Sequence, residues 1–258
     1  MWLKVLSGSL FMIMVLLLGP LWVAADTRLN SEGATSWRTA DRSSAGLAPN
    51  PVKTSEAVVQ VYAARAWSWR GYFAVHTWIS TKAEGASDYR VHQVIGWRRP
   101  VVQSQVQTPD QAWYGQSPTL LADLRGDQAA EAIVQIEQAV ADYPYPDQYR
   151  AWPGPNSNTF VAWVIRQTDA LNVALPNHAI GKDYLGMQVA AVPPGGAGLQ
   201  VSLGGIAGVL LGWREGLEMN ILGLSFGVNP MAMGIKLPGI GELALRNTNP
   251  MPPAQDEG

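Results

Sequence analysis

The chain has 258 residues, of which 47% are hydrophobic and 15% are charged, so it can build a core and is not broadly disordered. Its net charge of −2 argues against a protein that binds nucleic acid through a basic face. Because cysteine is absent, the sequence excludes disulfides, cysteine-ligated zinc, a thiol nucleophile and a lipoprotein anchor.

The N-terminal segment has no charged residue between Lys4 and Asp26. Residues 5–25 therefore form an uncharged run about as long as the 20 residues that cross a bilayer core. Lys4 precedes the run, which places the N-terminus inside and the bulk of the chain outside. We predict that residues 1–25 are a transmembrane anchor or a signal peptide, since the small residues 23–25 are compatible with cleavage. The expected location is the inner membrane, with the bulk of the chain periplasmic or extracytoplasmic.

Composition divides the rest of the chain into four segments. We predict a polar linker at 26–55, an α+β domain at 56–190, a Gly-rich β extension at 191–247 and a tail at 248–258. The glycines of the extension favour a β-meander with bends and bulges, and its predicted strands are 199–213, 217–229 and 234–245. A second membrane span is disfavoured because two prolines and two glycines interrupt its start, and a membrane-contacting hairpin remains the alternative.

The α+β domain is expected to be an antiparallel sheet packed on two helices. Hydrophobic alternation and a short glycine-containing loop predict a hairpin among its strands. Asp127 is a predicted N-cap of the first helix, and residues 159–167 form the second. Residues 98–126 contain three prolines and are expected to be irregular. The predicted strands are 57–65, 72–80 and 89–97.

Three side chains are candidates for catalysis. His76 and His92 fall in neighbouring predicted strands, so their imidazoles can meet if both point to the same face. Ser157 lies where a Pro/Gly-rich turn enters a helix, and the unpaired backbone N–H groups there can stabilise an oxyanion. A serine at a helix start beside a histidine on a strand has the geometry of a nucleophile with its general base. The residues expected to contact substrate are Asn156, Asn158 and Trp78.

Each candidate also has a purely structural interpretation. A serine at a helix start is commonly an N-cap, and a histidine in a strand is commonly a packed residue. His178 and Asp183 could form a further pair, although their spacing does not show that they meet. A metal held by His76, His92 and a carboxylate has no supporting ligand spacing, so we predict neither a metal nor a cofactor.

The order of the candidates resembles the circularly permuted papain-like hydrolases and acyltransferases of the NlpC/P60 and lecithin:retinol acyltransferase type. That group has a histidine on an early strand, a polar orienting residue on the next, and Asn-Cys-x-x-Phe at a helix start. The resemblance covers residues 57–167 and implies His76 as base, His92 as orienting residue and Ser157 as nucleophile, with Phe160 at the matching offset. Serine stands in place of cysteine, and an alkoxide is harder to form than a thiolate.

A second resemblance covers most of the chain after the N-terminal segment. The strings DRSSAGLAP, WSWRGYFAVHTWI, WPGPNSNTF and AIGKDYLG resemble an uncharacterised bacterial family, DUF3750. This resemblance implies a family and no activity.

The sequence thus predicts a membrane-tethered envelope protein with a papain-like site. The expected activity is that of an amidase, peptidase or acyltransferase on peptide or lipid material of the bacterial envelope. One alternative is a non-catalytic binding or structural protein. The other is a membrane-assembly partner whose C-terminal hairpins contact lipid or another subunit through an exposed apolar patch. The residues expected in that patch are Leu210, Ile221, Leu224 and Phe226.

Overall fold

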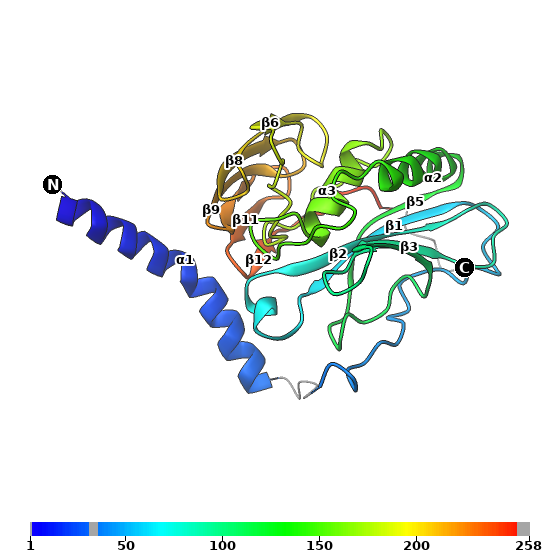
Figure 1. Cartoon of the computed structure of the whole chain (residues 1–258), viewed down its shortest axis with the longest axis horizontal. Helices are drawn as coiled ribbons and strands as arrows, with labels where there is room; N and C mark the ends of the chain where they lie inside the picture. Colours follow the sequence, from blue (N-terminus) through cyan, green and yellow to red (C-terminus); the bar gives the residue numbers. More distant parts are fainter. Residues whose placement is uncertain (1, 31–35, 252–258) are drawn as a thin grey trace.

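The computed structural model describes residues 2–30 and 36–251, and it contains a long N-terminal helix, two antiparallel sheets and two further α-helices (Figure 1). The predicted mixture of helices and antiparallel strands is therefore confirmed. The first sheet has the strand order β4-β3-β2-β1-β5, and the second has the order β12-β11-β10-β9-β8-β7-β6.

Helix α1 (Trp2–Asn30) contains the predicted apolar segment and extends beyond residue 25. Within it, Ser7–Leu29 is long and apolar enough to cross a membrane. Most of this stretch is exposed, and α1 projects from the body of the protein (Figure 1). A buried core helix is thereby excluded, and a membrane anchor or a signal peptide fits the observation.

The first sheet contains the three predicted strands and two more. Strand β2 starts later than expected because residues 68–72 form a short 3-10 helix, η1. The prediction that 98–126 is irregular was wrong, because β4 and β5 lie in this stretch. Its three prolines lie outside these strands, Pro100 before β4 and the other two between β4 and β5, so they do not interrupt strand pairing. The bounds are β1 Val58–Arg65, η1 Ser68–Tyr72, β2 Val75–Lys82, β3 Arg90–Val94, β4 Val102–Val106 and β5 Thr119–Arg125.

Helices α2 (Gly126–Ala141) and α3 (Ser157–Arg166) pack together and on the first sheet, and they form the main core with it. Phe160 and Ile136 are fully buried there. The predicted N-cap of α2 was wrong: Arg125 occupies that position without a side-chain cap. Asp127 lies in the first turn, where its charge is favourable to the helix dipole.

The Gly-rich region forms the expected meander, but the predicted strand bounds were wrong: each of the three predicted strands is a hairpin of two shorter strands. Positive φ at Gly204 and Gly223 permits the turns of two of these hairpins, β7–β8 and β9–β10. The strands are β6 Ala190–Ala191, β7 Gly198–Leu203, β8 Ala207–Gly212, β9 Gly216–Ile221, β10 Leu224–Asn229, β11 Gly234–Leu237 and β12 Gly241–Leu243.

The predicted linker and tail are partly anchored to this body. Ser44 Oγ donates to the carboxylate of Asp110 at 2.8 Å, and the side-chain amide of Asn249 donates to the carbonyl of Ala174 at 3.0 Å. Residues 31–35 of the linker and 252–258 of the tail lie outside the described residues.

Candidate functional site

A cavity of about 930 Å³ lies where α1, η1, the start of α3 and the turn between β9 and β10 converge. His76 and Ser157 both line it. Most of the remaining lining is aromatic or aliphatic, so the two polar side chains face an apolar space. The aromatic part of the lining includes Trp67, Trp69, Phe73, Trp97, Trp113 and Trp152.

The start of α3 leaves the Ser157 hydroxyl free. Asn156 is the N-cap, and its side-chain oxygen accepts from the backbone N–H groups of Asn158 and Thr159. The Thr159 hydroxyl accepts from the backbone N–H of Asn156, which completes a capping box. Ser157 is therefore not the N-cap, and its Oγ has no hydrogen bond to any described residue.

The two asparagines beside Ser157 hold α3 in place. Asn158 accepts from the Thr77 hydroxyl at 2.9 Å and donates to the carbonyls of Val75 and Ile180. Asn156 also donates to Ile180, at 2.9 Å. Both side chains touch the cavity, but the fold already uses their polar atoms, and these bonds fix the position of Ser157 relative to β2.

His76 is held in one orientation. Its Nε2 lies 3.0 Å from Oε1 of Gln93, and its ring stacks on Trp113 at 3.7 Å between centroids. Because the Gln93 oxygen is an acceptor, Nε2 carries the proton and Nδ1 keeps its lone pair. Burial lowers the pKa of His76 to about 4, although the Gln93 bond acts in the opposite direction. The imidazole is thus neutral at pH 7 and able to accept a proton.

The prediction that the imidazoles of His76 and His92 meet was wrong. Pairing of β3 with β2 sets His92 opposite Ile79, which places it on the face away from His76. His92 Nε2 lies 3.1 Å from the Thr81 hydroxyl, and Nδ1 lies 2.9 Å from that of Ser104. The neighbouring residue, Gln93, contacts the His76 ring instead. A metal site built from both histidines is excluded by the same geometry.

Trp78 lies behind His76, away from the cavity that contains Ser157. Its indole stacks on Tyr62 and its N–H donates to the carbonyl of Pro109 at 2.7 Å. These contacts support the sheet face that carries the histidine.

His178 and Asp183 do not form a pair. Asp183 accepts hydrogen bonds from Gln200 and Asn220, while the buried Nδ1 of His178 has no partner among the described residues. Burial lowers the pKa of His178 to about 3. Among the residues that the structure describes, no group of three or more metal-ligand side chains is present.

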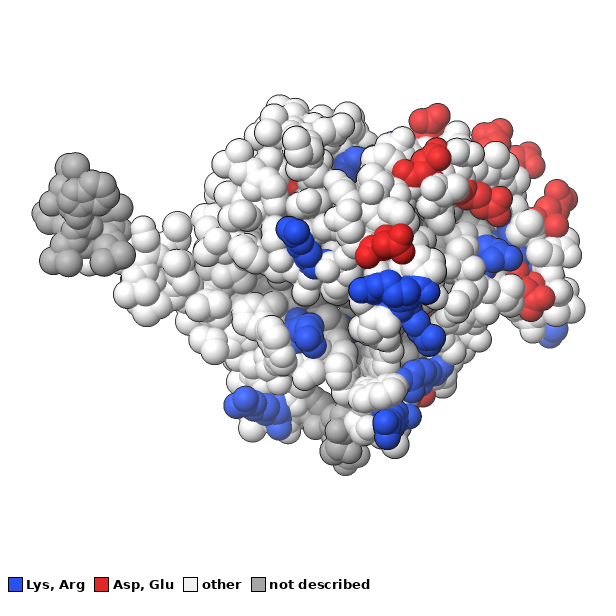
Figure 2. Space-filling view, in the orientation of Figure 1, with Lys and Arg blue, Asp and Glu red and all other residues white. Residues whose placement is uncertain are grey.

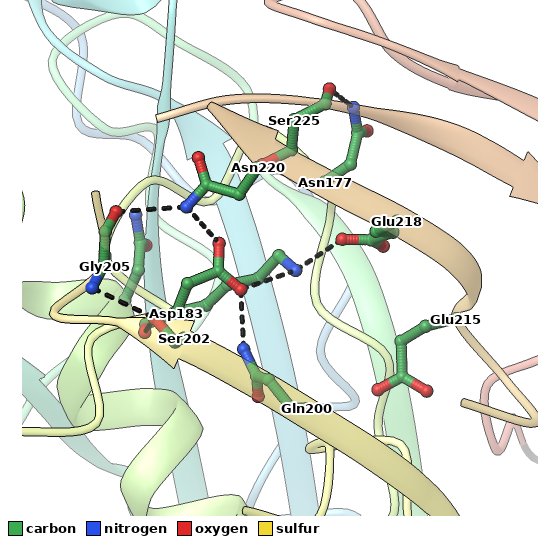
Figure 3. Close-up of polar contacts among 12 residues, drawn as sticks. Asn177, Asp183, Gln200, Ser202, Gly205, Glu215, Glu218, Asn220 and Ser225 are labelled. Carbon is green, nitrogen blue, oxygen red and sulfur yellow. Dashed lines mark hydrogen bonds and ion pairs between the residues drawn. The ribbon is translucent and has the colours of Figure 1, made fainter. Parts of the chain in front are cut away.

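Sequence reasoning missed a buried ionic cluster between the second sheet and the segment after α3 (Figure 3). Glu218 accepts from Lys182 at 2.6 Å and from Lys236 at 2.5 Å, and all three are at most 2% exposed. Burial by itself raises the pKa of Glu218, but the two lysines outweigh it and hold the pKa below its usual value. The alternation of polar residues in β7 and β9 was the available signal.

The fold defines an α+β protein with an apolar N-terminal helix. Its main cavity is apolar and is lined by His76 and Ser157. The chain belongs to the DUF3750 family of proteins of unknown function, whose model matches residues 56–184. That range includes His76, Gln93 and Ser157 but neither α1 nor the second sheet. Neither the curated proteins nor the solved structures contain a significant match to this chain.

Proposed function

We propose that Ser157 is the nucleophile and His76 the general base of an acyl-transferring enzyme, a hydrolase or an acyltransferase. The observation that carries this proposal is that both side chains line the same apolar cavity with their reactive atoms unoccupied by the fold. The serine hydroxyl is free of hydrogen bonds to described residues, and Gln93 fixes the imidazole with the lone pair of Nδ1 available.

In the proposed reaction, Ser157 Oγ attacks the carbonyl carbon of an ester or amide and gives its proton to Nδ1 of His76. The oxyanion lies at the N-terminus of α3, where Asn156 already binds the N–H groups of Asn158 and Thr159. The N–H of Ser157 itself is the remaining donor in this turn. His76 then protonates the leaving group, and water or a second acceptor attacks the acyl-serine with His76 again as base.

The papain-like resemblance supports this assignment with one change. A histidine on a strand, a polar residue on the adjacent strand and a helix start with the nucleophile are all present, with Gln93 in place of His92 as the positioning residue. A carboxamide oxygen on Nε2 keeps the ring in the tautomer that the base needs.

The cavity favours a substrate with an apolar chain. Its walls are rich in tryptophan, and Ile13 and Leu17 belong both to the lining and to the candidate membrane span. A lipid could therefore reach Ser157 directly from the bilayer. Among the envelope materials expected from the sequence, we propose acyl lipids over peptides as the substrates, on the extracytoplasmic side of the inner membrane.

A fluorophosphonate probe on the purified full chain in detergent micelles tests the proposal. We expect labelling of the wild type, no labelling of Ser157→Ala and labelling about 100-fold slower in His76→Ala, since general-base assistance is lost. Ser104→Ala, which changes a serine outside the cavity, should be labelled normally. Persistent labelling of Ser157→Ala, or a folded wild type that is never labelled, contradicts the assignment.

The pH dependence of labelling provides a second check. A base with a pKa of about 4 is neutral and competent above that pH, and it is lost as the pH falls through it. We therefore expect a labelling rate that is constant from about pH 8 to 5 and half-maximal near pH 4. Tryptophan fluorescence would verify that the protein stays folded at each pH. A midpoint near the ordinary histidine value of about 6.5 would show that His76 is solvated.

A non-catalytic receptor for an apolar ligand is the second candidate. It is favoured by the absence of a hydrogen bond between Ser157 and His76 among the described residues. In that case a fluorescent fatty acyl ligand would bind wild type and Ser157→Ala equally, and neither protein would react with the probe.

A further inference from the structure

The second sheet has its polarity reversed relative to the sheet of a soluble protein. Cross-strand pairing produces a continuous row of leucine, valine and isoleucine on its outer face, across six strands. These side chains are between 38% and 60% exposed. The row consists of Leu199, Leu211, Leu217, Val228, Ile235 and Leu243.

The adjacent row on the inner face is mainly polar. Gln200, Glu218 and Lys236 are at most 2% exposed. Gln200 accepts from Arg166 at the end of α3, and Glu218 accepts from Lys182 in the segment after α3 and from Lys236 in the same sheet. A one-sided sheet in water normally buries its apolar face and exposes its polar face. In this sheet the polar and charged side chains, which are costly to bury, are buried and paired, while the apolar row is exposed. We therefore do not expect the outer face to lie against water.

The outer face also lacks charge. The only charged residues in strands β6 to β11 are Glu218 and Lys236, and both are buried. In the view of Figure 2, the second-sheet part of the molecule is nearly all white, whereas acidic side chains gather toward the α2 side. A protein interface would normally have a polar, charged rim, whereas acyl chains require an uncharged surface.

The candidate membrane span is part of α1, and α1 also packs on the second sheet. The turn between β11 and β12 packs directly on α1: a Cβ added at Gly19 would meet the carbonyl oxygen of Pro238, and one added at Gly239 would lie 2.9 Å from Pro20. Gly19 lies ten residues before the end of the span at Leu29, which corresponds to about 15 Å along a helix. If α1 crosses a bilayer, this turn lies at the depth of the acyl chains.

We propose that the outer face of the second sheet, defined by the six-residue row above with Val201, Val209 and Met219, inserts into the same bilayer that α1 crosses. Its occupant is phospholipid acyl chain. This patch differs from the one expected from the sequence, because Leu210 and Leu224 are buried and the residues that alternate with them are exposed.

The absence of cysteine makes this insertion directly measurable. Leu211→Cys and Ile235→Cys would each be labelled with an environment-sensitive fluorophore in the full chain, reconstituted into phosphatidylcholine and phosphatidylglycerol vesicles. Val134→Cys on α2, which is similarly exposed, is the matched control. We expect doxyl-labelled lipids to reduce emission about twofold or more at residues 211 and 235 and to leave residue 134 unchanged.

The alternative results overturn the proposal. Quenching of the 211 and 235 labels by aqueous iodide, as at 134, would show that the face lies in water. Quenching by neither agent would show that protein covers the face, and cross-linking would then reveal a second copy. Labelling of Ser157 by the fluorophosphonate in the same variants reports separately on the catalytic proposal, so the two can fail independently.

Discussion

Replacing Glu218 by alanine is expected to lower the free energy of unfolding by about 3–5 kcal/mol, because two buried ammonium groups lose their shared counter-ion. Lys182 and Lys236 donate to the two oxygens of this carboxylate, and both lysines are nearly inaccessible to water. The midpoint of thermal unfolding, followed by tryptophan fluorescence in detergent, should fall by on the order of 10 °C.

Two comparisons identify the cause of that loss. Glu137→Ala on the exposed face of α2 should change stability little. The triple variant Lys182→Met, Glu218→Leu and Lys236→Met also removes the two buried ammonium groups and should recover part of the stability, since only Asp183 and Glu242 then lose a lysine partner. A triple variant as unstable as Glu218→Ala would show that the cost arises from packing.

The pH dependence has a defined sign. The folded pKa of Glu218 lies below its usual value, since the two lysines outweigh the effect of burial. The stabilisation by this carboxylate is therefore fully present above its unfolded pKa and is lost as the pH falls through the folded pKa. The difference between wild type and Glu218→Ala should shrink in acid.

Replacing Gln93 by leucine is expected to slow fluorophosphonate labelling of Ser157 by about 100-fold, through loss of the hydrogen bond that fixes the His76 tautomer. Without the Gln93 oxygen, Nε2–H has no partner, and a tautomer protonated at Nδ1 cannot accept the serine proton. The measurement is the second-order rate constant of labelling. Gln105→Leu makes the same change at an exposed position of β4 and should have no effect.

Gln93→Glu separates a positioning role from a structural one. A carboxylate beside His76 favours the imidazolium, so the midpoint of the pH profile should move above about 4. A variant with unchanged midpoint and normal rate would show that residue 93 does not act on the base.

Local sequence patterns predicted most of the fold. Alternation in residues 72–80 and 89–97 correctly predicted the strands β2 and β3, and the helix expected to begin near Asp127 is α2. Strands β4 and β5 were missed because nearby prolines were taken as evidence against pairing.

The site was predicted only in part, for a reason of register. A strand pattern shows which residues share a face but not which face of one strand matches that of its neighbour. Pairing of Ile79 with His92 decided this, and it turned Gln93 instead of His92 toward His76.

The sequence by itself determined the apolar N-terminal helix, the mixed α+β class and the presence of a serine at the start of a helix, since these depend on composition and local spacing. Only the tertiary structure decided that His76 and Ser157 share one cavity and that the second sheet turns its leucines outward. These features depend on contacts between distant segments: Lys182 must reach Glu218 across the fold before the polar face of the sheet can be buried.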